Sequence, residues 1–200
     1  MTKSRDTHPV RIPPRPRADW DDRVEEALSV LRPPGAAGKR PAGTPRPPSG
    51  IIDTFAQHPD LARGWMSFNS HLFSSTLSAR ARELVTVRIA WLRRGEYEWV
   101  QHVKMARAAG MTDEELEAIS VGADSPVWKP LDAALLRATD ELCHDRYVSD
   151  PTWAELAVEL SRQELMDLVF TVGAYDMLAM AMNTFGLQLD EGMTGFPEQA

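Results

Sequence analysis

The sequence predicts an all-α fold preceded by a proline-rich segment. Three observations indicate this class. Helix start and stop signals recur from residue 50 onward, no run alternates apolar and polar side chains as a strand would, and the composition is that of a globular chain. With 200 residues, 43% hydrophobic and 26% charged, the chain is large enough to bury a core of its own.

The first 50 residues differ from the rest. They hold ten of the 15 prolines, which remove hydrogen-bond donors and block helices. We therefore expect residues 1–50 to form a Pro-rich N-terminal arm with one short helix over 19–31, capped by Asp19. Such an arm either wraps a neighbouring subunit or is mobile, and the sequence leaves both open. Residues 51–200 are expected to form one helical domain.

Capping patterns place the helices of that domain. Pro59 suits a first turn, Ser78 is a predicted cap, and Gly110 suits a helix end. Thr112 with Glu115, and likewise a serine and glutamate at 161 and 164, match the capping-box pattern. The predicted helices cover 59–73, 79–93, 96–109, 113–120, 131–146, 151–160 and 162–185.

Charge and hydropathy exclude several functions. The net charge is −7, but residues 1–50 carry +4 and the remainder −11. An acidic domain disfavours nucleic acid as a partner, because phosphate contacts need cations. The N-terminus lacks the apolar stretch of a secretory signal. The most apolar region, 165–187, contains Asp167, Asp176 and Asn183, which indicates a buried helix and not a membrane span. We expect a cytoplasmic protein.

Cysteine usage limits the chemistry further. Cys143 is the single cysteine, so an internal disulfide is impossible and a cysteine-based zinc site is disfavoured. Its neighbours at helical spacing are apolar, which predicts a packing role.

Two predicted helices carry a candidate catalytic cluster. Glu83 lies on the 79–93 helix, which is apolar on nearly every side and therefore central. Glu98 and His102 are four residues apart and share a face of the next helix. A short turn at Gly95 makes these helices antiparallel neighbours, so the three side chains can meet in one pocket as an acid/base cluster. Spacing alone also fits a solvated surface pair, or a metal site, although only one histidine and two carboxylates converge.

Five further residues are candidate substrate-binding groups: Arg88, Tyr97, Trp99, His71 and Tyr175. Arg88 would offset a substrate carboxylate or, alternatively, pair with Glu83. Tyr97 and Trp99 would shape the pocket or an intersubunit contact, or pack in the core. His71 would face the same cavity or be a structural histidine, and Tyr175 would be hydrogen-bonded inside the protein.

The stretch RELVTVRIAWLRRGEYEWVQHVKMARAAG (82–110) resembles the carboxymuconolactone decarboxylase/alkylhydroperoxidase D-like family. The flanks HPDLARGWMSF, TDEELEAIS and ELMDLVFTVGAYDMLAMAMNTFG fit as well, and the resemblance covers about residues 19–190. It implies an all-α fold that assembles into trimers or hexamers, with pockets near subunit contacts.

The resemblance also implies roles for individual residues. The peroxidase branch of the family carries Cys-x-x-Cys-x-x-x-His with a preceding glutamate in a proton relay. The glutamate and histidine fall on Glu83 and His102, whereas the two cysteines fall on Gly95 and Glu98. Dithiol peroxidase chemistry is therefore disfavoured, because no thiol stands at either position.

These observations predict a cofactor-free enzyme of the thiol-less branch, with no metal. It would act on a small carbonyl, lactone or carboxylate compound with decarboxylase-like or related proton-transfer chemistry. His102 would be the general acid/base, Glu83 would orient it, and Glu98 would be a second proton carrier or a pocket wall. The alternative is a non-catalytic oligomer that binds a small molecule. The identity of the substrate lies beyond the sequence.

Overall fold

The computed structural model describes residues 9–31, 49–190 and 192–197. Every regular element within these ranges is helical, as predicted. The α-helices are α1 (Asp22–Ala27), α2 (Gly50–Phe55), α3 (Pro59–Phe73), α4 (Ala79–Leu92), α5 (Glu96–Ala108), α6 (Asp113–Ala118), α7 (Pro130–Asp145), α8 (Asp150–Glu159) and α9 (Arg162–Phe185), and two 3-10 turns, η1 (Arg17–Asp19) and η2 (Leu28–Leu31), flank α1.

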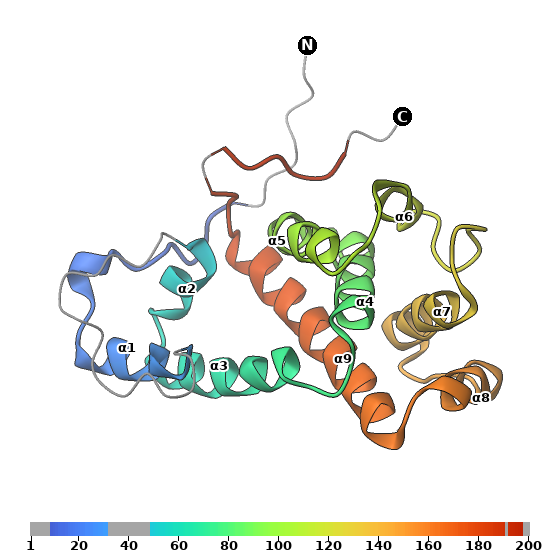
Figure 1. Ribbon diagram of the computed structural model, residues 1–200. Helices are drawn as coiled ribbons and strands as arrows, with labels where there is room; N and C mark the ends of the chain where they lie inside the picture. The colour runs from blue at the N-terminus through green and yellow to red at the C-terminus, as the bar shows by residue number, and fades with distance from the viewer. Residues whose placement is uncertain (1–8, 32–48, 191, 198–200) are drawn as a thin grey trace, which may run out of the picture.

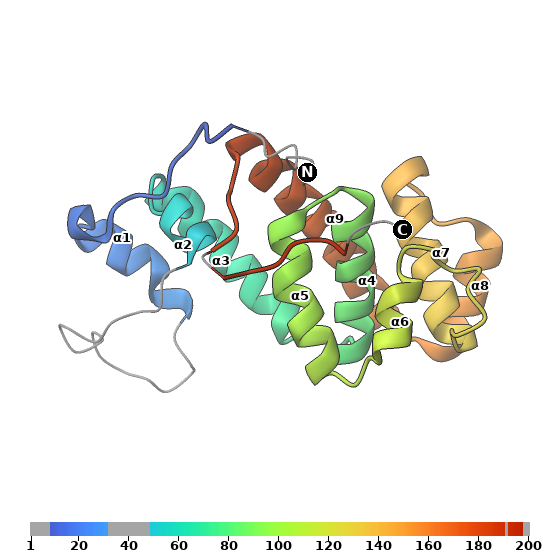
Figure 2. The ribbon, with the colours of Figure 1, turned by 90° about the horizontal axis from the view of Figure 1, so that it is seen from above.

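Helix α4 lies at the centre of the molecule. It contacts α5, α7 and α9, while α1–α3 pack together on one side of α9 and α6–α8 lie on the other (Figures 1 and 2). Nine of its residues are buried, among them Leu84, Val85 and Ile89, which are fully inaccessible. This all-round burial explains why α4 is apolar on nearly every side.

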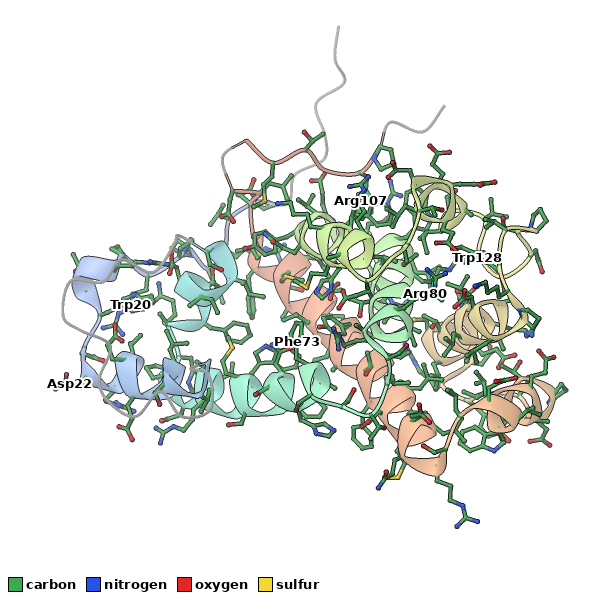
Figure 3. The ribbon with its side chains drawn as sticks, viewed as in Figure 1. Trp20, Asp22, Phe73, Arg80, Arg107 and Trp128 are labelled. Carbon is green, nitrogen blue, oxygen red and sulfur yellow. The ribbon has the colours of Figure 1, made fainter. Side chains whose placement is uncertain are left out.

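Local chemistry sets the helix ends where the sequence placed them. The Ser78 hydroxyl accepts a hydrogen bond from Ala81 N, and both predicted capping boxes are formed, by Thr112 with Glu115 and by Ser161 with Glu164. Ion pairs then join the elements: Arg80 of α4 donates to Glu115 of α6 and to Asp132 of α7 (Figure 3).

The N-terminal segment differs from the prediction. Instead of one helix over 19–31 there are two 3-10 turns around a short α1, and its cap is Asp21, not Asp19. The described part packs against its own chain: Arg11 N and Ile12 N both donate to Phe185 O, and Val24 is fully buried. Residues 9–31 thus pack against their own chain, and the parts of the predicted arm at 1–8 and 32–48 lie outside the described residues.

Helix α9 is 24 residues long and, by length and composition alone, could cross a membrane. However, 61% of its most apolar 18-residue window is buried inside the protein, as in the core helix of a globular domain.

Gly186, with φ of 74°, ends α9 in the left-handed conformation that glycine adopts without strain.

Candidate functional site

The Glu83–His102 contact predicted from the sequence is present. The turn at Arg94 and Gly95 reverses the chain between α4 and α5, and His102 Nδ1 lies 2.7 Å from Glu83 Oε2. Both residues are buried, with relative exposures of 1% for Glu83 and 6% for His102. Because a carboxylate accepts, this contact places the imidazole proton on Nδ1 and leaves Nε2 as the nitrogen available to a ligand.

Two further contacts fix this pair. Arg82 Nε donates to the other oxygen of Glu83 at 3.0 Å, so the carboxylate is held from both sides. The ring of Tyr175, on α9, meets the His102 ring edge to face, with 4.9 Å between centroids. Arg82 in turn lies over the Phe73 ring at the end of α3 (Figure 3). The imidazole therefore has a defined orientation before any ligand arrives.

Glu98 lies one helical turn before His102, but its carboxyl, unlike the side chains of Glu83 and His102, has no hydrogen-bond partner in the described part of the chain. It is 2% exposed, and neither carboxyl oxygen has a hydrogen-bond partner among the described residues. Burial, and secondarily the negative charge of Asp176, raise the pKa of Glu98 well above its ordinary value of 4.5. Burial therefore favours the uncharged, proton-donating form of this side chain.

Gly95 leaves the space that the Glu98 carboxyl occupies. A Cβ built on Gly95 would lie 3.1 Å from Glu98 Oε2, closer than ordinary van der Waals contact. The φ of Gly95 is −79°, so its backbone does not require glycine. The two residues that stand at the family's cysteine positions thus fit one another.

A cavity of about 370 Å³ is lined by two of the three predicted acid/base residues, whereas Glu83 contacts His102 but does not line the cavity. Glu98, His102 and Tyr175 line it, and Tyr97 does so from the first turn of α5. The predicted internal hydrogen bond of Tyr175 is wrong: its hydroxyl is buried but has no hydrogen-bond partner in the described part of the chain. Burial raises the pKa of this hydroxyl. Tyr97 donates to Asp190 Oδ2 at 3.3 Å, and burial raises its pKa too.

Three of the predicted binding residues lie elsewhere. Arg88 points to α7 and donates to both oxygens of Asp140, at 2.7 and 2.8 Å. The expected Arg88–Glu83 pairing is therefore wrong, since Arg82 takes that place, and Arg88 does not line the cavity.

The other two are His71 and Trp99. His71 has a side chain 57% exposed and contacts Asp167 at 3.0 Å, away from the cavity. Trp99 packs against Trp91 and Phe196, with centroids 5.6 and 5.2 Å away. His71 is therefore a structural histidine and Trp99 a packing residue, which are the alternatives that the sequence left open.

Some cavity-lining residues were not predicted. Asn69 of α3 lines the cavity. It lies three and four residues after Met66 and Trp65, so this polar side chain shares the buried face of an amphipathic helix. That departure from the apolar pattern was a usable signal. Asp190 follows α9 in an irregular segment, and nothing local in the sequence indicated that it returns to the cavity.

No group of three or more His, Cys, Asp or Glu is placed to hold a metal ion within residues 9–31, 49–190 and 192–197. Cys143 is buried on α7, where burial raises its pKa to about 11. A thiol in that environment is a poor nucleophile.

Residues 59–141, which contain α4, α5 and the acid/base cluster, match the Carboxymuconolactone decarboxylase family. This segment spans about two fifths of the chain, and its match agrees with the resemblance seen in the sequence. The similarity to this family supports a catalytic role. No curated protein matches the sequence.

Several solved structures share the fold of this chain. The alkylhydroperoxidase AhpD core protein of Ralstonia eutropha JMP134, an uncharacterized peroxidase-related protein, has a TM-score of 0.71 at 18% identity, covering 92% of this chain and 94% of its own. The putative antioxidant defence protein ATU0492 of Agrobacterium tumefaciens gives 0.64 at 22% identity, covering 68% and 94%. A variant of the debrominase Bmp8, in complex with 2,3,4-tribromopyrrole, gives 0.69 at 12% identity, covering 93% and 95%.

Proposed function

We propose that this protein is a cofactor-free enzyme that moves protons on a small carbonyl, lactone or carboxylate substrate bound in the 370 Å³ cavity. One observation carries the proposal. A buried, unpaired carboxylic acid, Glu98, and an imidazole held by a carboxylate, His102 with Glu83, line the same cavity one helical turn apart. Such a site holds a proton donor and a proton acceptor with different environments, which general acid–base catalysis requires.

Each group has a role in the proposed reaction. His102 Nε2 takes a proton from the carbon next to the substrate carbonyl, and the electron pair of that C–H bond moves to the carbonyl oxygen. The neutral Glu98 carboxyl donates its proton to that oxygen, which stabilises the enol. In the decarboxylating version the C–C bond to the carboxylate breaks instead, CO₂ leaves, and the electron pair of that bond moves to the carbonyl oxygen as an enolate. The enolate carbon then takes the proton of Glu98, and the carbonyl forms again. Glu83 stabilises the imidazolium form of His102.

The family's dithiol chemistry does not fit this chain. It requires two thiols within reach of one another, and the sequence has the buried Cys143 alone. We therefore expect no thiol-dependent peroxide consumption. A peroxide assay with a dithiol reductant measures this directly.

Proton exchange in D₂O tests the proposal across several classes of carbonyl compound at once. Small ketones, γ-lactones and 3-oxo acids are incubated with the enzyme, and loss of the C–H signal next to the carbonyl, or release of CO₂, is followed by NMR. We expect acceleration by the wild type, and a loss of about 10²–10⁴-fold in His102→Asn and in Glu98→Gln. His144→Asn, the same change at an exposed position of α7, is the matched control.

Binding of these compounds without any exchange or CO₂ release would overturn the catalytic proposal in favour of a small-molecule-binding protein. Acceleration that persists in His102→Asn would overturn the assignment of that residue.

The exposed face of α9 supports self-association. Met166, Phe170, Met177 and Met180 recur at spacings of three, four or seven residues and are 50–61% exposed in the single chain. Such a stripe is typical of a helix face covered by another helix. We propose that a second copy of the chain covers it in a homo-oligomer. Phe170→Glu should lower the mass measured by light scattering, and an unchanged mass would reject this contact.

A further inference from the structure

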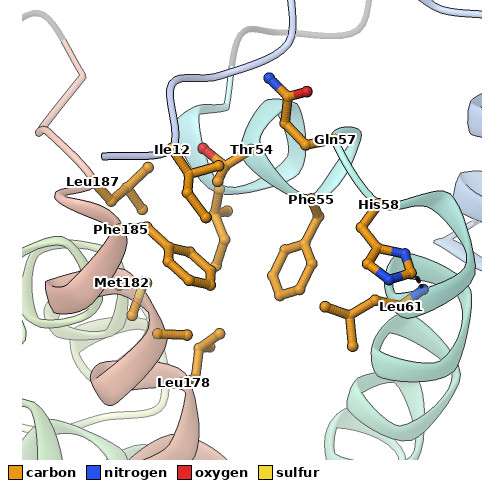
Figure 4. A pocket seen from close by; sticks show the side chains of 12 residues that line it. Ile12, Thr54, Phe55, Gln57, His58, Leu61, Leu178, Met182, Phe185 and Leu187 are labelled. Atoms are coloured by element: carbon orange, nitrogen blue, oxygen red, sulfur yellow. Dashed lines mark hydrogen bonds between the residues drawn. The ribbon is translucent and has the colours of Figure 1, made fainter. Parts of the chain in front are cut away.

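A second cavity adjoins the acid/base cavity. It has a volume of about 170 Å³ and lies, partly open to solvent, between α2, the start of α3 and the end of α9 (Figure 4). Its walls are almost entirely apolar and include Ile12, Phe55, Leu61, Ala181, Phe185 and Leu187. An apolar cavity of about 150 Å³ in another protein stays dry and binds benzene, so this volume suits an aromatic ring or a short alkyl chain.

Three side chains separate the two cavities. Ile51, Leu178 and Met182 line both of them, so the dividing wall is one side chain thick. Met182 has three rotatable side-chain bonds and adapts its shape at low cost. Met182 is therefore the most adaptable side chain of this wall.

The N-terminal segment completes the second cavity. Ile12 lies over it because Arg11 N and Ile12 N both donate to Phe185 O, at 2.8 and 3.2 Å. Thr54 is 7% exposed, and its hydroxyl has no hydrogen-bond partner among the described residues. An apolar ligand would not pair this hydroxyl, so only the apolar walls and the volume of the second cavity point to its ligand.

We propose that the substrate is elongated and amphipathic: its carbonyl or carboxyl head lies at Glu98 and His102, and an attached ring or alkyl chain passes Met182 into the second cavity. This inference rests on the proposed function for the position of the head. It adds a substrate class, carbonyl compounds or lactones that carry an apolar group of about six carbons.

γ-Lactones whose alkyl tail grows from one to eight carbons test the proposal by calorimetry with the full chain. Burial of each methylene is worth about 0.8 kcal/mol, so affinity should rise about fourfold per added carbon until the tail fills the cavity. Ala181→Phe, which fills the cavity from α9, should remove this gain and leave the affinity of the one-carbon lactone unchanged. Leu61→Trp, from the opposite wall at a residue 50% exposed, is a second variant should the first not fold.

The matched control is Ala154→Phe, the same change at an exposed position of α8, which should retain the full gain. An affinity independent of tail length, a gain that persists in both filled variants, or no binding of any lactone would overturn the inference. Failure of this inference is distinguishable from failure of the proposed function. A tail-dependent affinity without proton exchange rejects catalysis alone. Proton exchange on short lactones, with an affinity that does not depend on the tail, rejects the second cavity alone.

Discussion

Two buried polar groups on opposite sides of α4 show how a structural group differs from a functional one. Toward α7, Arg88 donates to both oxygens of Asp140 and to Ile119 O, so its guanidinium is fully used. Toward α5 and α9, Glu98 is just as buried, yet neither of its oxygens has a partner in the described chain. A satisfied buried charge fixes the fold, whereas an unsatisfied acid at a cavity is available to a ligand.

A glycine makes room for each group. A Cβ on Gly122 would lie 2.6 Å from Arg88 Nη2, and one on Gly95 would lie 3.1 Å from Glu98 Oε2. Gly122 also has φ of 88°, so that turn needs glycine for conformation as well as for space. Gly95 is needed for space only. A glycine thus makes room for the Arg88–Asp140 ion pair at one site and for the unpaired Glu98 at the other.

The largest effect on stability is expected at the satisfied group. Arg88→Met leaves Asp140 and the Ile119 carbonyl without their donor, and the partly exposed Asp140 regains some water. We expect the free energy of unfolding to fall by about 2–3 kcal/mol, measured by urea denaturation. A change below about 0.5 kcal/mol would contradict the structural role of this pair. Arg107→Met, at an exposed ion pair with Asp113, is the control and should cost little.

At Glu98, the group without partners in the described chain, we expect a substitution to raise the stability instead of lowering it. Glu98→Met replaces an unpaired buried acid by an apolar side chain of similar length. We expect the free energy of unfolding to rise by about 1–2 kcal/mol while proton exchange is lost. A variant that is both less stable and inactive would mean that Glu98 is a packing residue.

The same carboxyl gives a specific pH dependence. Its pKa in the folded protein lies well above the ordinary 4.5, because burial disfavours the charge. At a pH between the unfolded and the folded pKa of Glu98, the folded protein holds a proton that the unfolded chain has lost. The contribution of Glu98 to stability is therefore fully present below pH 4.5 and is lost as the pH rises through the folded pKa. The slope is at most about 1.4 kcal/mol per pH unit. The difference between wild type and Glu98→Gln in urea titrations should show it, and parallel curves would contradict the raised pKa.

The sequence predicted those features that depend on neighbouring residues. The caps at Ser78 and Ser161 follow from local hydrogen bonds, and the Glu83–His102 contact follows from a tight turn between two helices. The partner of Arg88 was not predictable in this way, because Asp140 is 52 residues away on a helix whose packing no local pattern encodes. The second cavity was missed for the same reason, since it forms only where the N-terminal segment, α2 and α9 meet.

The smallest expected effect concerns the fit between Gly95 and Glu98. Gly95→Ala pushes the Glu98 carboxyl by a few tenths of an ångström, so we expect proton exchange to slow only a few-fold. In the Glu98→Ala background the added methyl meets no carboxyl, and its cost in unfolding free energy should be smaller by about 0.5 kcal/mol than in the wild type. Gly173→Ala is the control, because a Cβ there has nothing within 4 Å and should stabilise α9. Equal costs in both backgrounds would show that the two residues at the family's cysteine positions act independently, and the contrast with Gly122 and Arg88 would then lose its basis.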